Sequence, residues 1–337
     1  MLKTKLCELL GIEYPIVCAG MGAVALAELA AAVSEAGGLG TIGIAGLSPE
    51  AIHREIASAR QLTQKPLAVN VLVPFLRPGV IEALAHEPIQ AVTIFWGEPE
   101  ESIEPLINGG IKIIWQCGSA AHARAAVKAG ADAIMAQGFE AGGHVQGTVS
   151  TMVLVPEVRD VIDHTPLIAA GGMADGRGLV AALALGADGA AFGTRFVAST
   201  EAAAAMSYKQ RILMGSGENT VHTTLYDVGW PNAPHRVLRT ETVERWERAG
   251  RPPSGHRPGE GQPIGVLKHN GYELASLTRY SVMPPTKDFE GDEEELAFYA
   301  GQSCSLVHEA MSAGAIVREI ARDAATIIDG RLAPITR

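Results

Sequence analysis

Short apolar runs alternate with alanine-rich segments of helical spacing from the start of the chain to about residue 214. Each run is nearly continuously apolar and is followed by a helical stretch, a pattern typical of parallel strands covered by helices. The pattern predicts eight strands. They are YPIVCAG (14–20), LGTIG (39–43), LAVNVLV (67–73), AVTIFWG (91–97), IKIIWQCG (111–118), AIMAQG (133–138), PLIAAGG (166–172) and GAAFGT (189–194).

The segments between these runs have the periodicity of helices. In LAELAAAVSEAGG (26–38), leucine and alanine recur every three or four positions, and the segment stops at two glycines, a common helix end. Eight strand–helix units close most economically into a (β/α)8 TIM barrel, and a doubly wound open sheet is the alternative. The predicted fold class is therefore α/β.

The periodic pattern ends beyond residue 214. Residues 215–300 are rich in proline, glycine, arginine and aromatic residues, and a last helix is expected over about 303–329. We expect three parts: a barrel (1–214), a lid or cap over its mouth (215–300) and a C-terminal helix that packs back on the barrel (301–337). A contact within a homodimer is the competing interpretation of the middle part. The run EGDEEEL (290–296) is expected to be a solvated helix start, not a metal site.

Composition and charge exclude several classes of partner. The net charge of −10 leaves no basic surface for nucleic acid. No stretch approaches the roughly 20 apolar residues that cross a bilayer, and the N-terminus lacks the pattern of an export signal. The four cysteines form no CxxC pair, so we expect reduced, buried thiols in a cytoplasmic protein and no metal site.

One histidine stands in a glycine-rich loop after the sixth predicted strand. In FEAGGHVQG (139–147), Gly142 and Gly143 precede His144. Loops after the carboxyl ends of barrel strands build the active site, and glycine allows a ligand to approach the backbone closely. A histidine that only packs against a neighbouring helix is the alternative. The position of the loop favours a catalytic role for His144.

Two more glycine turns follow the last two predicted strands. AAGGMADGRG presents Gly171 and Gly172 before a helix, and AFGTRF presents Gly193 and Thr194. Loops after strands seven and eight of these barrels, with a helix N-terminus behind them, are the usual phosphate site. The two turns therefore predict a phosphate-binding site.

Three of these stretches also carry a family resemblance. YPIVCAGM, AQGFEAGGHVQG and PLIAAGGMADGRGLVAALALGADGAAFGTRF resemble the nitronate monooxygenase family, formerly called 2-nitropropane dioxygenases. The family consists of FMN-containing TIM barrels, and its relatives include a flavin-dependent enoyl-ACP reductase and NADH:quinone reductases. The resemblance covers about residues 5–205 and returns at YAGQS (299–303).

The resemblance implies where FMN would bind. Asn70, Gln116 and Gln137 are amides at strand ends, suited to the polar edge of the isoalloxazine ring. A neutral amide at Gln116 would stabilise an anionic reduced flavin less than a cation would. The cofactor-binding residues expected are Asn70, Gln116, Gln137, Gly142, Gly171, Gly172, Ala191, Phe192, Gly193 and Thr194.

His144 matches the catalytic histidine of the family. An imidazole beside the flavin can hold an anionic nitronate by a charge-assisted hydrogen bond or take a proton from a neutral nitroalkane. Tyr226, Trp230, Tyr280 and Tyr299 are aromatic residues that could wall the cavity, and Tyr299 is preferred as a substrate contact because it begins YAGQS.

Three functions are consistent with the sequence. The leading one is FMN-dependent oxidation of an alkyl nitronate by oxygen, which gives a carbonyl product and nitrite. The alternative is an NAD(P)H-dependent flavin reductase acting on a quinone or an enoyl thioester; the lack of a GxGxxG motif discriminates little. A third, of another class, is a phosphate-binding isomerase or a non-catalytic sugar-phosphate binder without flavin.

Overall fold

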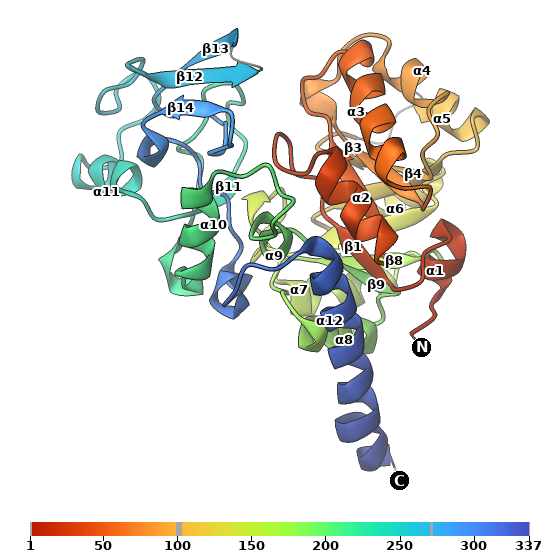
Figure 1. The fold of residues 1–337 in the computed structure, drawn as a ribbon. Helices are drawn as coiled ribbons and strands as arrows, with labels where there is room; N and C mark the ends of the chain where they lie inside the picture. Colours follow the sequence, from red (N-terminus) through yellow and green to blue (C-terminus); the bar gives the residue numbers. More distant parts are fainter. Residues whose placement is uncertain (1, 99–102, 270–271, 337) are drawn as a thin grey trace.

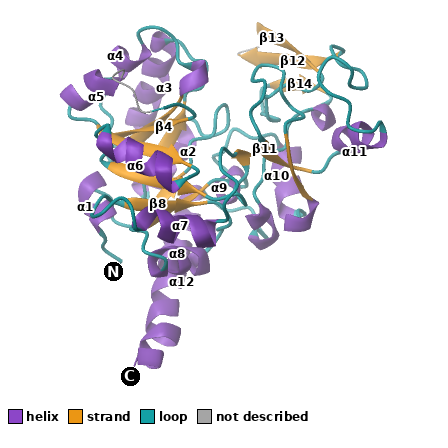
Figure 2. Ribbon diagram, turned by 180° about the vertical axis from the view of Figure 1, so that it is seen from behind, coloured by secondary structure: helices purple, strands orange, loops and turns teal. Residues whose placement is uncertain are grey.

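The computed structural model describes residues 2–98, 103–269 and 272–336. Each of the three predicted parts of the chain includes one or more residues that lie outside the described ones, namely 1, 99–102, 270–271 and 337. Figure 1 shows a barrel wrapped by helices, with a second group of strands and helices beside it. Figure 2 shows the same arrangement from behind.

Eight parallel strands form the barrel, which confirms the predicted fold and all eight predicted strands. Their order around the sheet is β1-β9-β8-β6-β5-β4-β3-β2. A parallel bridge between Val17 and Leu39 joins β1 to the start of β2 and so links the two ends of the sheet. The strands are β1 (Ile16–Cys18), β2 (Gly40–Gly43), β3 (Leu67–Leu72), β4 (Ala91–Phe95), β5 (Lys112–Cys117), β6 (Ala133–Gln137), β8 (Leu167–Ala170) and β9 (Gly189–Phe192).

Helices cover the outside of the barrel, as the alanine-rich spacing predicts. Ser48, Ser119 and Asp175 cap three of them, since each side chain accepts a hydrogen bond from a backbone N–H of the first turn. The helices are α2 (Ala27–Glu35), α3 (Pro49–Leu62), α4 (Val80–Leu84), α5 (Glu104–Asn108), α6 (Ala120–Lys128), α7 (Thr151–Arg159) and α8 (Gly176–Ala184).

Side chains of each strand alternate between two apolar layers. In β3, Leu67, Val69 and Val71 belong to the large layer between strands and helices. Ala68 belongs to the layer inside the barrel, which helix α1 (Lys5–Leu10) closes at one end with Leu6 and Leu10. The alternation decides which residues at the strand ends can face the barrel mouth.

The chain leaves the barrel after α9 (Thr194–Val197) and builds a lobe, which we define as residues 198–312. The sequence pattern predicted no strands here, but the lobe contains two three-stranded sheets, β10-β11-β7 and β13-β12-β14. One strand of the first sheet, β7 (Gly143–His144), comes from the loop after β6. The other elements are β10 (Thr220–Thr223), β11 (His235–Leu238), β12 (Pro263–His269), β13 (Tyr272–Thr278), β14 (Phe289–Gly291), α10 (Met206–Leu213) and α11 (Glu241–Arg248).

The lobe has its own small core and buried ion pairs. Tyr226 and Tyr280 are fully buried in this core, away from the barrel cavity. Glu295 is also buried, and its carboxylate pairs with Arg245 at 2.8 Å and Arg279 at 2.9 Å. The sequence pattern predicts that the acidic run at 290–296 is solvated. The structure differs at its last carboxylate, because two arginines neutralise Glu295 inside the lobe.

After the lobe the chain returns to the barrel as α12 (Ala313–Ile327), which packs between α8 and α2. A Cβ on Gly176 would lie 2.5 Å from the backbone nitrogen of Ala324, so the two helices approach closely there. The helix starts ten residues later than predicted because a 3-10 segment covers Gln302–Leu306 and Ser312 provides the cap. α12 thus takes the place of the helix that follows the last barrel strand.

We predict that truncating the buried face of α12 destabilises the protein. Ile320 is 2% exposed, and Ile320→Ala should lower the free energy of unfolding by about 2–5 kcal/mol, because it removes packed methyl groups and leaves a cavity. Thr326→Ala, at an exposed position of the same helix, is the matched control and should change it by less than about 0.5 kcal/mol. Chemical denaturation measures both, and equal small losses would show that α12 does not support the barrel.

Candidate active site

A cavity of about 270 Å³ opens at the carboxyl ends of the barrel strands. Its wall takes residues from every one of the eight barrel strands or the loop that follows it, and from the lobe. Among its lining residues there is no aspartate, glutamate, lysine or arginine. The cavity is therefore apolar and uncharged, with a few amide, hydroxyl and imidazole groups.

All of the predicted site residues except Phe192 line this cavity. The alternation along β9 explains the exception: Ala191 faces the inside of the barrel, and the side chain of Phe192 lies in the layer under the helices. The side chain of Phe192 thus has no contact with the cavity, so only its backbone could contribute to the cofactor site expected there. Cys18 and Cys117 face the same outer layer, and all four cysteines are unpaired and buried.

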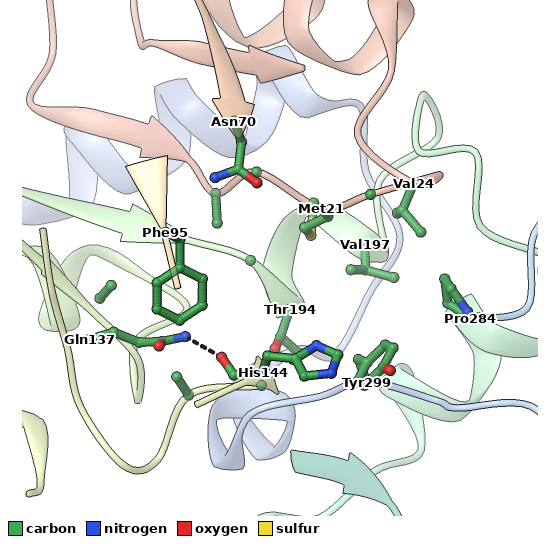
Figure 3. Close-up of a pocket in the computed structure, with 18 of the residues that line it drawn as sticks. Met21, Val24, Asn70, Phe95, Gln137, His144, Thr194, Val197, Pro284 and Tyr299 are labelled. Atoms are coloured by element: carbon green, nitrogen blue, oxygen red, sulfur yellow. Dashed lines mark hydrogen bonds between the residues drawn. The ribbon is translucent and has the colours of Figure 1, made fainter. Parts of the chain in front are cut away.

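The three predicted amides come from strands β3, β5 and β6 and line the cavity. Asn70 donates from Nδ2 to the carbonyl oxygen of Thr93, at 3.3 Å. Gln137 donates from Nε2 to the carbonyl oxygen of His144, at 3.0 Å, as Figure 3 shows. The other amide atom of Gln137, Oε1, is buried without a partner among the described residues. A buried orphan acceptor of this kind is expected where a ligand supplies the missing donor.

The glycines of the predicted turns are there for different structural reasons. Gly171 and Gly172 have φ values of +96° and +76°, which side chains rarely adopt. A Cβ on Gly142 would lie 2.3 Å from the backbone nitrogen of Gly301. Gly193 differs, because a Cβ there would meet no protein atom nearer than 3.6 Å. The space beside Gly193 therefore belongs to the cavity.

The backbone of His144 is fixed by strand pairing with the lobe. His144 lies opposite His235 and Gly143 lies opposite Arg236 in the antiparallel pair of β7 and β11. The amide of Val145 donates to the carbonyl oxygen of Pro234 at 2.9 Å and continues this contact. The loop after β6 is thus held from the lobe side by backbone hydrogen bonds and from the barrel side by Gln137.

The His144 imidazole lies among aromatic rings. It stacks on Trp230 with 4.0 Å between ring centroids and 28° between planes, and Tyr299 and His235 lie at 5.4 and 5.2 Å. Its Nε2 is buried without a partner in the described part of the chain. Burial is the main cause that lowers the pKa of His144 to about 2, with a smaller contribution from the neighbouring imidazole of His235. The side chain is therefore neutral at physiological pH.

His235 is also neutral, because both of its ring nitrogens are used. Its Nε2 accepts from the backbone N–H of Tyr226 at 3.3 Å, so Nδ1 carries the proton and donates to the carbonyl oxygen of Ala233 at 2.9 Å. Burial lowers the pKa of His235 to about 4. The histidine pair therefore brings no positive charge to the cavity.

Tyr299 lies beside His144 in Figure 3, but its hydroxyl is already engaged. It donates to the carbonyl oxygen of Val282 at 2.8 Å, and burial raises the pKa of this phenol well above its ordinary value. Tyr299 can offer its ring face to a ligand while its hydroxyl braces the lobe. Thr194 is similar, since its Oγ1 accepts from the backbone N–H of Gly301 at 2.9 Å.

Several lining residues were missed by the sequence analysis. The loop Ala19–Val24 after β1 forms one wall, and Val282–Pro284 of the lobe forms another. A Cβ on Gly20 would lie 2.1 Å from Cβ of Asn70, so this loop presses against the end of β3. Its glycine-rich sequence AGMGA, directly after a strand, was a usable signal; the lobe residues offered none.

Comparisons with known proteins agree with this geometry. The family model described as nitronate monooxygenase matches residues 3–79 and 77–323. A probable nitronate monooxygenase of Staphylococcus saprophyticus is 34% identical over 291 residues, 72% of this chain and 81% of the relative. A (3aS,4S,5R,7aS)-5-hydroxy-7a-methyl-1-oxo-octahydro-1H-indene-4-carboxyl-CoA dehydrogenase of Mycobacterium tuberculosis is 40% identical over 253 residues, 74% of this chain and 70% of the relative.

Solved structures show the same likeness over nearly the whole chain. FabK from Thermotoga maritima is 33% identical, with a TM-score of 0.80 over 99% of both chains. Nitroalkane oxidase from Streptomyces ansochromogenes is 29% identical, with a TM-score of 0.77 over 97% of this chain and 99% of the other.

In the part that the structure describes, no helix is both long and apolar enough to cross a bilayer. The chain belongs to the nitronate monooxygenase family of flavin-dependent oxidoreductases.

Proposed function

We propose that this protein uses FMN to oxidise alkyl nitronates with molecular oxygen, giving a carbonyl product and nitrite. The observation that carries the proposal is the neutral, buried and unpartnered imidazole of His144 above an uncharged cavity. An N–H of this imidazole can donate to a nitronate oxygen, and such a bond to an anion is strong where water is excluded.

The residues of the cavity fit a flavin mononucleotide. Gln137 has an orphan acceptor for a ring N–H, and Gln116 on the adjacent strand β5 and Asn70 on β3 also line the cavity. The glycine turns after β8 and β9 provide backbone close to a phosphate, at Gly172, Gly193 and Thr194. FMN bound there would supply the redox chemistry, accepting electrons from the substrate and passing them to oxygen.

The geometry favours a preformed nitronate over a neutral nitroalkane. Taking the α-proton of a nitroalkane requires a base, and burial makes His144 a weak one by lowering its pKa to about 2. Holding an anion requires only a fixed N–H donor. The protein itself would therefore orient the nitronate, exclude water and stabilise the negative charge of the nitronate by a hydrogen bond.

A second candidate function is reduction of a quinone or an enoyl thioester by NAD(P)H. The uncharged lining of the cavity favours it, because a neutral carbonyl also suits a neutral N–H donor and needs no counter-charge. The M. tuberculosis relative is named for a carboxyl-CoA substrate. A flavin-free isomerase or sugar-phosphate binder is set aside, because the relatives are oxidoreductases. A homodimer and a cytoplasmic location stay predictions.

Anaerobic mixing separates the two candidate functions. We expect an alkyl nitronate to bleach the flavin absorbance rapidly, and NADH and NADPH to bleach it slowly or not at all. Admission of oxygen should then restore the colour and release nitrite. Rapid bleaching by a nicotinamide and none by the nitronate would replace the first function with the second.

Gly193→Val tests the proposed phosphate end of the cofactor site. A Cβ at this position has room within the protein, so the variant should fold, but the branched side chain would occupy cavity space that the phosphate needs. We predict that it purifies with little or no FMN. The control is Gly330→Val, in the helical segment Ile328–Leu332 after α12, where a Cβ would meet no atom within 4 Å. Full FMN content in Gly193→Val, measured by absorbance, would place the phosphate elsewhere.

His144→Ala tests the proposed donor. Because the cofactor phosphate would be held after β8 and β9, the variant should keep FMN, and loss of the hydrogen-bond donor should lower kcat/KM for a nitronate by about 10²- to 10³-fold. His164→Ala, on an exposed position, is the control and should act as wild type. A loss of only a few fold would mean that His144 is structural, and loss of FMN would make it a cofactor contact.

A further inference from the structure

Of the described aromatic rings of the lobe that lie beside His144, Trp230 has the shortest distance between ring centroids. It is 6% exposed and stacks on the imidazole, with 4.0 Å between ring centroids. Two barrel side chains hold Trp230 in turn: Phe75, edge-on at 5.0 Å, and Trp96, edge-on at 4.9 Å. The indole is therefore wedged between two barrel loops and the proposed catalytic ring.

We propose that Trp230 is a positioning residue that holds the imidazole of His144 by stacking and keeps water from it. The proposal rests on the function proposed above. The stack covers one face of the imidazole and fixes the plane of the ring. Since a hydrogen bond from an imidazole N–H runs along that plane, a substrate oxygen can meet the donor from one direction only. Trp230 thus sets where the substrate must lie.

The second effect of Trp230 concerns the charge of His144. No side-chain carboxylate pairs with this imidazole among the described residues. Two titratable side chains pack around it. His235 is neutral through its two hydrogen bonds, and the hydroxyl of Tyr299 donates to the carbonyl oxygen of Val282. The guanidinium of Arg236, on the same strand as His235, donates to the carbonyl oxygen of Phe139 and to Thr220.

Desolvation is therefore the main cause that keeps His144 neutral, and the stacked indole of Trp230 covers one face of the ring. Removing the indole admits water to the ring. The pKa of His144 then rises from about 2 toward its ordinary value of 6.5. A lobe residue that only stabilised the fold would not change this titration.

The test is a titration of the FMN-bound enzyme labelled with ¹⁵N-histidine, followed by NMR from pH 5 to 8. His144 is assigned by the loss of its signals in His144→Ala. In wild type, we expect no titration of His144 in this range. In Trp230→Ala, His144 should titrate within it, kcat for a nitronate should fall about 10²-fold, and kcat should acquire a new dependence on pH between 5 and 7. FMN content should not change.

Two further variants keep the test decisive. Trp230→Phe retains a smaller ring and should lie between wild type and Trp230→Ala; if the alanine variant does not fold, this variant alone must shift the titration upward. Trp246→Ala removes a tryptophan of the same lobe that packs on Arg251 instead, and should match wild type.

Two results would overturn the proposal. One is titration of His144 near pH 6.5 already in wild type. The other is an identical His144 titration in wild type and in the Trp230 variants, whatever happens to turnover. If no enzyme form oxidises a nitronate, the proposed function fails, and the NMR titration still decides the role of Trp230.

Discussion

The antiparallel pairing of β7 with β11 is the contact on which the site depends. It joins two residues of a barrel loop, Gly143 and His144, to a strand that lies about ninety residues further along the chain. Without it the loop after β6 would be a glycine-rich connection free to adopt many conformations. With it, His144 has the backbone order of a sheet residue while its side chain faces the cavity. The lobe thus completes the candidate active site by backbone hydrogen bonds.

Burial of His144 determines the protonation state of its imidazole. The cavity is lined without acidic or basic side chains, and the rings around His144 exclude water. A cationic imidazole is unfavourable there, so a histidine that would act as a base in water becomes a neutral donor. Any charge that the reaction requires must come from the substrate, from the flavin, or from backbone amides at the glycine turns.

The sequence predicted the barrel well because parallel strands and their helices are encoded locally. Continuous apolar runs identified every barrel strand, and the period of two within a run decides which residue faces inward. Applied strictly, that period would have placed Phe192 in the outer layer, since Ala191 beside it faces inward. The resemblance to the family covers the whole segment and does not separate inward-facing from outward-facing residues.

The lobe could not be predicted in the same way. β7 has two residues and β11 has four, and neither is long enough to show the apolar pattern by which a strand is recognised in a sequence. Their pairing depends on contacts distant in sequence, for which a local pattern carries no signal. The positioning role proposed for Trp230 could not be predicted locally either, because it follows from three rings that are distant in sequence. Ser312 is a local cap, but the apolar residues before it hid the later start of α12.

Hydrogen exchange of the loop after β6 tests the central claim most directly. Peptides that cover residues 141–147 and 233–238 should take up deuterium slowly and together, at rates near those of the barrel strands, because their amides pair across β7 and β11. Trp230→Ala should leave this protection in place, since the pairing is made by the backbone. Exchange of residues 141–147 within seconds, as in an unpaired loop, would contradict the account.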